Sequence, residues 1–189
     1  MYETLNEVRA DIAERLAAAA SERRSPMHTP VVATAGADAR VMVLRAFDPA
    51  SWTLRFHTDL RSPKVAAIEA DRRIAVVAYD RDAGVQLRLR GTGRIEGAGA
   101  AVDAAWAEST NFARRCYLGE GPGAASEGPT SGLPEQFEGV EPGDAELLPA
   151  RGNFALLLVE VAEIDWFSLA HTGHRRALVT RYGGQWIAP

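Results

Sequence analysis

The spacing of hydrophobic residues predicts a long helix at the start of the chain. Apolar residues there recur every three or four positions, as on one face of a helix: Leu5, Val8, Ile12 and Leu16. Alanines fill many of the positions between them and favour helix. We therefore expect an amphipathic N-terminal helix over residues 3–24, within a segment 1–25 that the following prolines close.

After this helix the pattern changes to short β-type runs separated by turn residues. The predicted strands are 31–35, 41–47, 52–58, 74–79, 85–96, 153–161, 164–169, 177–181 and 185–187. Only two further helices are expected, at 64–70 and 99–117. Many short strands with few helices between them predict a mainly β (α+β) fold, a small antiparallel barrel with peripheral helices, in one domain over residues 1–189.

The run 85–96 alternates most clearly. Val85, Leu87 and Leu89 should face one side of a sheet. Gln86 and Arg88 should face the other side, either as the wet face of an antiparallel sheet or as hydrogen-bonding groups for a heterocycle.

Residues 119–143 have a different composition, with seven Gly, four Pro, five Glu and no Lys or Arg. Such a Gly/Pro-rich acidic segment predicts a loop. The sequence leaves open whether this loop is a lid over a site or a disordered insertion.

Charge and cysteine content narrow the function classes. A formal net charge of −4 does not favour nucleic acid as a partner. One cysteine and four scattered histidines exclude a disulfide framework and give no zinc-ligand spacing, so no metal site is expected. No secretory pattern and no apolar run of membrane-spanning length is found, so we expect a cytoplasmic protein without membrane contact.

Three groups of residues could bind a ligand. Arg40 and Arg45 bracket a short apolar stretch, Val41, Met42 and Val43. Side chains five positions apart on a regular strand point to opposite faces, so the two arginines share one ligand only if a strand end or a bulge redirects one of them.

The second group lies at a predicted strand-to-helix junction, residues 56–64. It contains His57, Thr58, Arg61, Ser62 and Lys64, and Lys64 is the only lysine of the chain. Hydroxyl groups and cations at the start of a helix can hold a phosphate, although a solvated turn would have a similar composition.

The third group is Trp166 with His174, Arg175 and Arg176, across a predicted hairpin. An aromatic ring and a planar cation could flank a flat ligand, but a tryptophan in a strand is more often a core residue. No nucleophile with an adjacent base is indicated, so the sequence favours a protein that binds a phosphorylated cofactor and leaves the chemistry to it.

Taken together, these groups resemble the pyridoxamine 5′-phosphate oxidase family of FMN-binding split barrels, in particular its Alr4036-type branch. The matching segments are Arg40-Val41-Met42-Val43-Leu44-Arg45, Phe56-His57-Thr58 with Ser62-Pro63-Lys64, Gln86-Leu87-Arg88-Leu89-Arg90-Gly91, the pair Trp166 and Arg176, and Gln185-Trp186-Ile187-Ala188-Pro189. The resemblance covers residues 28–97 well, 152–189 moderately and the stretch between poorly.

The resemblance implies an FMN-dependent oxidoreductase that acts as a homodimer, with the cofactor at the interface and a small molecule as substrate. It implies that Arg40, Ser62 and Lys64 hold the FMN phosphate, and that His57 and Thr58 line the ribityl chain. Gln86 would hydrogen-bond the edge of the isoalloxazine ring, Arg45 and Arg176 would approach its polar side, and Trp166 would pack beside it. Arg61 would compensate for Pro63, which stands where the oxidase has an arginine, and Val41, Met42, Val43 and Arg88 belong to the matching cofactor-binding strands.

Other departures argue against strict pyridoxamine 5′-phosphate oxidation. Thr172 stands where the oxidase has a substrate-binding arginine, and residues 109–115 do not reproduce the oxidase's phosphate-binding set. The substrate therefore stays open. An F420-dependent reductase and a non-enzymatic flavin or haem binder, such as a sensor or stress protein, are the alternatives, with a barrel that holds no cofactor as the last of them.

Overall fold

The computed structural model describes residues 2–189. Its first element is the helix α1 (Leu5–Ser21), which begins at a capping box between Thr4 and Glu7. The predicted helix is confirmed, and Val8, Ile12 and Leu16 lie on its buried face.

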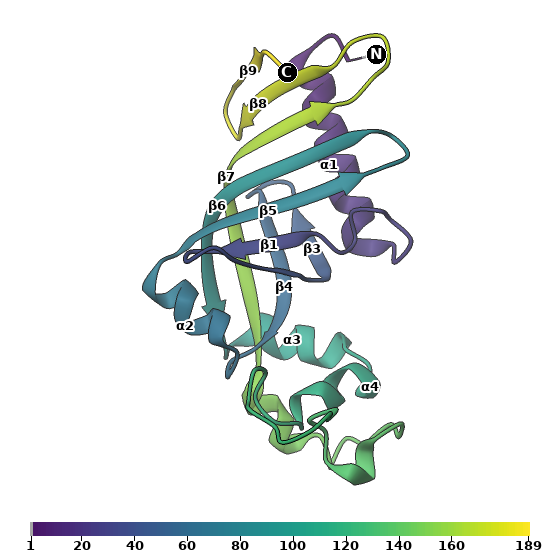
Figure 1. Ribbon diagram of the computed structural model, residues 1–189, viewed down its shortest axis with the longest axis vertical. Coiled ribbons are helices and arrows are strands. Elements are labelled where there is room, and N and C mark those ends of the chain that lie inside the picture. The colour runs from purple at the N-terminus through teal and green to yellow at the C-terminus, as the bar shows by residue number, and fades with distance from the viewer. Residues whose placement is uncertain (1) are drawn as a thin grey trace.

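Nine strands form one antiparallel sheet, which confirms the mainly β prediction. Their bounds are β1 (Val31–Thr34), β2 (Asp38–Val41), β3 (Leu44–Asp48), β4 (Thr53–Asp59), β5 (Arg73–Asp80), β6 (Val85–Glu96), β7 (Phe154–Ser168), β8 (Arg175–Thr180) and β9 (Gly184–Ile187). Seven of them follow the order β2-β1-β5-β6-β7-β4-β3, and β8 and β9 extend the sheet from β7. Figure 1 shows β7 running along most of the long axis, with β8 and β9 at one end.

The sheet curls because its two ends are neighbours in the chain. β2 ends at Val41 and β3 begins at Leu44, although these strands stand at opposite ends of the seven-strand order. The short connection is held by backbone bonds from Met42 N to Pro30 O (3.0 Å) and from Leu44 N to His28 O (2.9 Å). The predicted single strand 41–47 is therefore wrong, since the chain crosses here from one edge of the split barrel to the other.

Two other predicted boundaries differ from the structure. The predicted strands 153–161 and 164–169 are one strand, β7, whose register against β6 shifts between Arg90 and Gly91. A Cβ atom at Gly91 would stand 2.0 Å from the carbonyl oxygen of Glu160, so only glycine allows the two strands to approach this closely. The irregular pairing bends the strands without interrupting them.

The predicted helix 99–117 is broken into α3 (Ala100–Glu108), α4 (Asn111–Arg114) and a 3₁₀ turn, η1 (Arg115–Tyr117). Thr110 starts α4, where its hydroxyl accepts a hydrogen bond from the backbone N–H of Ala113. The side chain of Thr110 thus caps a new helix within the segment 99–117, which the sequence predicted as one helix.

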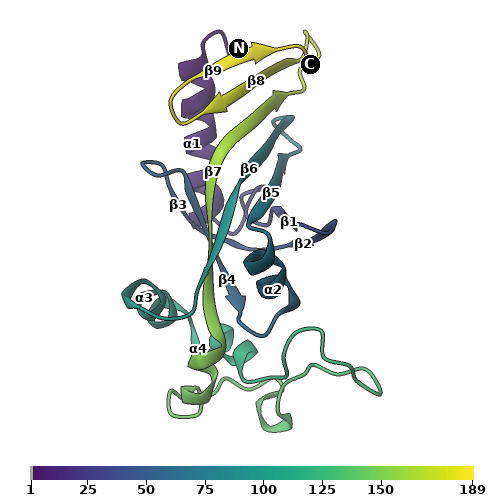
Figure 2. The ribbon, with the colours of Figure 1, turned by 90° about the vertical axis from the view of Figure 1, so that its left-hand side faces the viewer.

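Helix α2 (Pro63–Ala70) and α1 pack on the barrel, as Figures 1 and 2 show, while α3, α4 and the loop 119–143 gather at the end of the molecule opposite β8 and β9. The core lies between α1 and the inner face of the sheet, with Phe56, Leu87 and Trp166 among its fully buried side chains. The loop is packed at two points, through buried Phe137 and through Arg115, whose guanidinium donates to Phe137 O at 2.7 Å and Val140 O at 3.0 Å.

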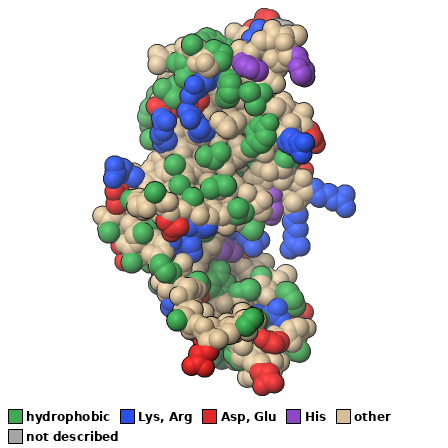
Figure 3. Space-filling model, in the orientation of Figure 1, with side chains coloured by type: hydrophobic (Ala, Val, Ile, Leu, Met, Phe, Trp, Pro, Cys, Tyr) green, Lys and Arg blue, Asp and Glu red, His purple; other side chains and the backbone are tan. Residues whose placement is uncertain are grey.

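The outer face of the sheet, on the side away from α1, carries exposed apolar side chains in register. Val41, Val31 and Val77 are neighbours across β2, β1 and β5, and their exposed fractions are 64%, 40% and 37%. Tyr79, 45% exposed, lies one step further along β5. Figure 3 views this side of the molecule, where hydrophobic side chains are spread over the strands. We call Val31, Val41, Val77 and Tyr79 the apolar row.

Candidate functional site

A cavity of about 410 Å³ lies where the connection between β2 and β3 meets β4, α2 and the segment after α4. Its lining contains eight residues that the sequence singled out as cofactor-binding: Arg40, Val41, Met42, Val43, Arg45, His57, Thr58 and Lys64. The volume is within the range of small-molecule sites.

Arg40 and Arg45 both line this cavity, which the simple alternation of a strand would not allow. Arg40 belongs to β2 and Arg45 to β3, and the pairing of β3 with β4 shifts between Leu44 and Ala46. The sequence required a strand end or a bulge between the two arginines for a shared ligand, and the structure has both, since β2 ends at Val41 and the register shifts at Arg45.

Lys64 lies in the first turn of α2, and its ammonium group is held by hydroxyl groups. Its Nζ donates to Ser62 Oγ at 2.7 Å and to Thr58 Oγ1 at 3.3 Å. Ser62 caps α2 without using its hydroxyl for the helix backbone, and Pro63 fills the first helical position, where a missing N–H costs nothing. The turn therefore presents a cation, two hydroxyl groups and a helix N-terminus at one place.

The charges around Lys64 leave it short of a counterion. Burial, followed by the charge of Arg40, lowers the pKa of Lys64, and these effects outweigh the attraction of Asp59 and Asp38. Arg40 itself pairs with Asp38, a carboxylate that is 65% exposed, and donates to Thr34 Oγ1 at 3.2 Å. Two cations close enough to repel each other in a cavity form a site that an anion would stabilise.

His57 forms part of the cavity wall in its neutral form. Burial, helped by the charges of Arg45 and Arg55, lowers its pKa to about 4. Its Nε2 atom is buried without a hydrogen-bond partner among residues 2–189, and its ring packs edge-on against Phe154 with centroids 4.9 Å apart.

Arg61 does not line the cavity, contrary to the prediction. Its guanidinium is bound to Asp59, with Nη2 2.7 Å from Oδ2, and it donates to the carbonyl oxygen of Gly119 at 2.8 Å. These donors attach the turn 59–62 to the beginning of the loop.

The remaining wall of the cavity comes from residues that the sequence analysis missed: Ala113, Cys116, Tyr117 and Pro122, together with Asp59. The ring of Tyr117 packs against Phe154 with centroids 5.1 Å apart, and burial raises the pKa of its hydroxyl. Ala113, Cys116, Tyr117 and Pro122 lie after the helix break at Thr110, in a stretch where the sequence analysis found no binding motif. Arg114 and Arg115, the neighbouring cations, bind backbone carbonyl groups instead, at Trp106 and Phe137 respectively.

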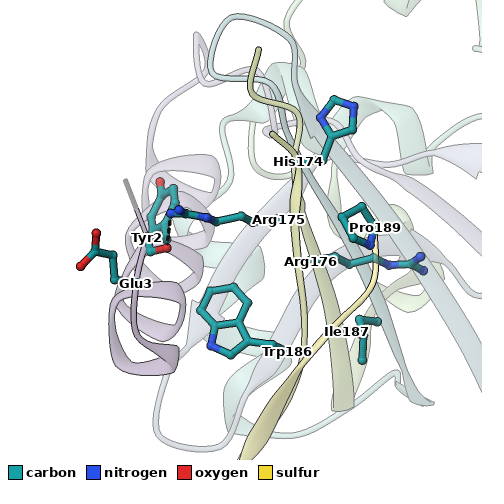
Figure 4. Close-up of a pocket in the computed structure, with 8 residues that line it drawn as sticks. All are labelled: Tyr2, Glu3, His174, Arg175, Arg176, Trp186, Ile187 and Pro189. Carbon is teal, nitrogen blue, oxygen red and sulfur yellow. Dashed lines mark hydrogen bonds between the residues drawn. The ribbon is translucent and has the colours of Figure 1, made fainter. Parts of the chain in front are cut away.

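Gln86, Arg88 and Arg176 are not in this cavity. They lie on the outer face of the sheet, on β6 and β8, with Arg88 directly opposite Val77 of the apolar row. Arg176 lines a second cavity of about 400 Å³ with His174 and Trp186. Figure 4 shows Arg175 and Arg176 pointing to opposite sides of β8, with Arg175 bound to Tyr2.

Trp166, predicted to pack beside a ligand, lies in the core of this chain. Trp166 is fully buried, its indole N–H donates to Asp11 Oδ2 at 2.8 Å, and Tyr2 packs edge-on against its ring. Because successive side chains of a strand point to opposite faces, that of Trp166 points from β7 into the core. There it connects the sheet to α1 through its bond to Asp11.

Two other classes of site can be examined in the same way. Within residues 2–189, no group of three or more His, Cys, Asp or Glu side chains is arranged to hold a metal ion. None of the helices in that range is long and apolar enough to cross a bilayer.

Comparison with known proteins agrees with this geometry. Residues 11–97 match the family model described as pyridoxamine 5′-phosphate oxidase, FMN-binding domain. This range contains most of the lining of the first cavity. No curated protein matches the chain.

Solved structures share the fold over nearly the whole chain. A pyridoxamine 5′-phosphate oxidase-related, FMN-binding protein from Nostoc punctiforme is 23% identical, covers 100% of both chains and has a TM-score of 0.75. PhzG from Burkholderia lata, in complex with tetrahydrophenazine-1-carboxylic acid, is 15% identical, with 98% of this chain and 92% of its own covered and a TM-score of 0.64.

A protein from Clostridium acetobutylicum related to general stress protein 26 is 11% identical, with 92% of this chain and 95% of its own covered and a TM-score of 0.57. At these identities the shared property is the fold. The curled sheet has the split-barrel fold of these structures, and residues 11–97 are similar to the FMN-binding domain of the pyridoxamine 5′-phosphate oxidases.

Proposed function

We propose that the protein binds FMN non-covalently and transfers two electrons between the flavin and a small molecule. The observation that carries this proposal is that two cations, Arg40 and Lys64, line the first cavity, where burial and then the charge of Arg40 lower the pKa of Lys64. A phosphate monoester placed between them would receive charge-assisted hydrogen bonds and relieve their repulsion.

The rest of the cavity suits the remainder of the cofactor. Thr58, whose hydroxyl accepts a hydrogen bond from Lys64 at 3.3 Å, lines the cavity together with His57 and the aromatic ring of Tyr117. Arg45 lines the same cavity from the bulge of β3 and supplies positive charge for the polar side of the ring. When bound, FMN supplies the hydride or electron-pair chemistry, and the residues named here bind and orient it.

The active unit that we propose is a homodimer. Gln86, Arg88 and Arg176 face outward on the sheet, so within one chain they cannot contact a ligand in the first cavity. A second copy packed on the apolar row would cover its exposed valines and bring these polar groups to the cavity of the first copy. Val41 fits this arrangement, because it belongs both to the row and to the lining of the first cavity.

The substrate class remains broad. The arginines at 114 and 115, which are next to Cys116 and Tyr117 in the chain, are not in the lining of the cavity and bind backbone carbonyl groups of the chain itself. This arrangement does not favour a second phosphate group, so we do not propose pyridoxamine 5′-phosphate oxidation. The fold can hold flat acids, since PhzG was solved with tetrahydrophenazine-1-carboxylic acid.

The deciding experiment is the visible spectrum of the freshly purified protein, with the released cofactor identified by mass and the oligomeric state measured by sedimentation. We expect the two absorption bands of a flavin, the mass of FMN and a dimer. The spectrum of a deazaflavin or of haem would identify that group as the ligand in place of FMN. A colourless protein that takes up no added FMN would contradict the proposal.

A further inference from the structure

Asp165 lies between two arginines on the outer face of the sheet. It is on β7, and the arginines come from the strands on either side, Arg88 from β6 and Arg176 from β8. Arg176 makes two bonds to the carboxylate, Nε to Oδ1 at 2.9 Å and Nη2 to Oδ2 at 2.7 Å. Arg88 Nη2 binds the same Oδ2 atom.

This carboxylate is unusual for its position. Asp165 lies on the outer face of the sheet, because the residues that alternate with it along β7 form the inner face. Nevertheless, only 3% of its surface is exposed. Hydrogen bonding by Arg176, with a further contribution from Arg88, lowers the pKa of Asp165, so the group stays ionised. Two guanidinium groups and one carboxylate leave a net charge of +1 on the unit.

One donor of the unit has no partner, and one of its arginines borders a cavity. The Nε atom of Arg88 is buried without a partner among the residues that the structure describes. Arg176 also borders the second cavity, beside His174 and Trp186. Its guanidinium stands 5.9 Å from the centre of the Phe167 ring, and the ring of His174 packs on the same phenylalanine with centroids 5.7 Å apart.

We propose that Asp165 is a positioning residue that fixes the direction of Arg88 and Arg176 and offsets one of their two charges at the polar edge of the flavin. This inference rests on the proposed function, in which a second copy brings these arginines to the cofactor. Without the carboxylate the two guanidiniums would repel each other, and their separate rotamers would not define one direction. With the carboxylate in place, the two guanidiniums form a single donor surface with a net charge of +1. This charge balances the one negative charge that a reduced flavin gains.

The test compares Asp165→Asn with the control Glu163→Gln. Glu163 lies on the same strand and pairs with Arg90 of β6 at 2.6 Å, so its substitution also removes one carboxylate from an arginine pair between β6 and β7. Its side chain is 29% exposed and it has no second arginine. The measurement is the midpoint reduction potential of the bound flavin, with bound FMN quantified in the same samples.

In Asp165→Asn the amide oxygen still accepts a bond from Arg176, while the charge of the unit rises from +1 to +2. We expect FMN to stay bound and its reduction potential to shift to more positive values, with Glu163→Gln at the wild-type potential. An unchanged or more negative potential in flavin-loaded Asp165→Asn would overturn the inference and leave FMN binding intact. A shift of equal size in Glu163→Gln would also overturn it, because the effect would then be a general one of charge.

Should Asp165→Asn fail to fold, Arg176→Gln decides the question, because it lowers the charge of the same unit to zero. The expected shift is then to more negative potentials, and an unchanged potential would overturn the inference. A wild-type protein that binds no FMN would remove the proposed function, and this inference with it.

Discussion

The first cavity and the outer sheet face each bring two cationic side chains together, but they neutralise them differently. On the sheet face, Arg88 and Arg176 share the buried carboxylate of Asp165. In the cavity, Lys64 donates to hydroxyl groups, and the carboxylate that pairs with Arg40 is largely exposed. Arg88 and Arg176 therefore have a counterion within the chain, whereas Lys64 and Arg40 would gain more from an added anion.

The comparison separates two uses of arginine and lysine in one small protein. A buried counterion fixes cations in place and limits their net charge. Hydroxyl groups hold a cation in place without neutralising its charge. The cation can therefore still attract an anionic ligand. Under the proposed function, the cavity supplies binding energy for FMN and the sheet face tunes its electrostatics.

The largest expected effect is on FMN affinity in the double variant Lys64→Ala with Arg40→Ala. Loss of charge-assisted bonds to the phosphate should cost about 1.5–3 kcal/mol for each cation. The measurement is quenching of FMN fluorescence on titration with the protein. Arg73→Ala is the control, because Arg73 is 84% exposed and pairs only with Asp71 at the surface. Equal affinity of the folded double variant and the wild type would refute the phosphate assignment.

The second prediction tests whether the two regions meet in a dimer. Val31→Asp places a charge in the middle of the apolar row, and we expect a monomer in sedimentation with at least a roughly tenfold loss of FMN affinity, or about 1.4 kcal/mol. Tyr182→Asp, at a residue that is 90% exposed between β8 and β9, should leave the dimer intact. A Val31→Asp protein that remains dimeric would move the interface to another surface.

The third prediction concerns pH and His57. Its pKa is about 4 in the folded protein against 6.5 for the free side chain, so between these values the unfolded state binds more protons. The free energy of unfolding should therefore fall as the pH is lowered from about 6.5 to 4, by about 1–3 kcal/mol from this group.

Urea unfolding at several pH values measures this effect. In His57→Asn the decrease with falling pH should be smaller by that amount. Identical pH profiles for His57→Asn and the wild type would show that His57 is not held neutral.

The smallest effect is expected from shortening the loop tip. Residues 123–131 are exposed, whereas Pro122 lines the cavity and Phe137 is buried. Replacing 124–130 by a short Gly-Ser linker should change FMN affinity by less than about 0.5 kcal/mol and, if the loop acts as a lid, should alter turnover of a substrate. Loss of FMN from this variant, measured by the same fluorescence titration, would contradict a lid and assign the tip to cofactor binding.

The sequence by itself determined most of the helices and strands and most of the residues that line the first cavity. Hydrophobic spacing identified α1, alternation identified β6, and the order of short motifs named eight residues that line one cavity. These signals are local, because side-chain periodicity follows from the geometry of a helix or a strand.

Only the tertiary structure decided which of those residues meet. The crossing between β2 and β3 and the bulge at Arg45 bring two arginines together that an ideal strand would separate. Asp165 had no motif, and its role follows from strands that are distant in sequence and adjacent in the sheet. Trp166 carried a motif but is buried under α1, since inward or outward direction depends on the face that the helix covers. Long-range pairing has no local signature, and for that reason the sequence could name the residues but not assemble the site.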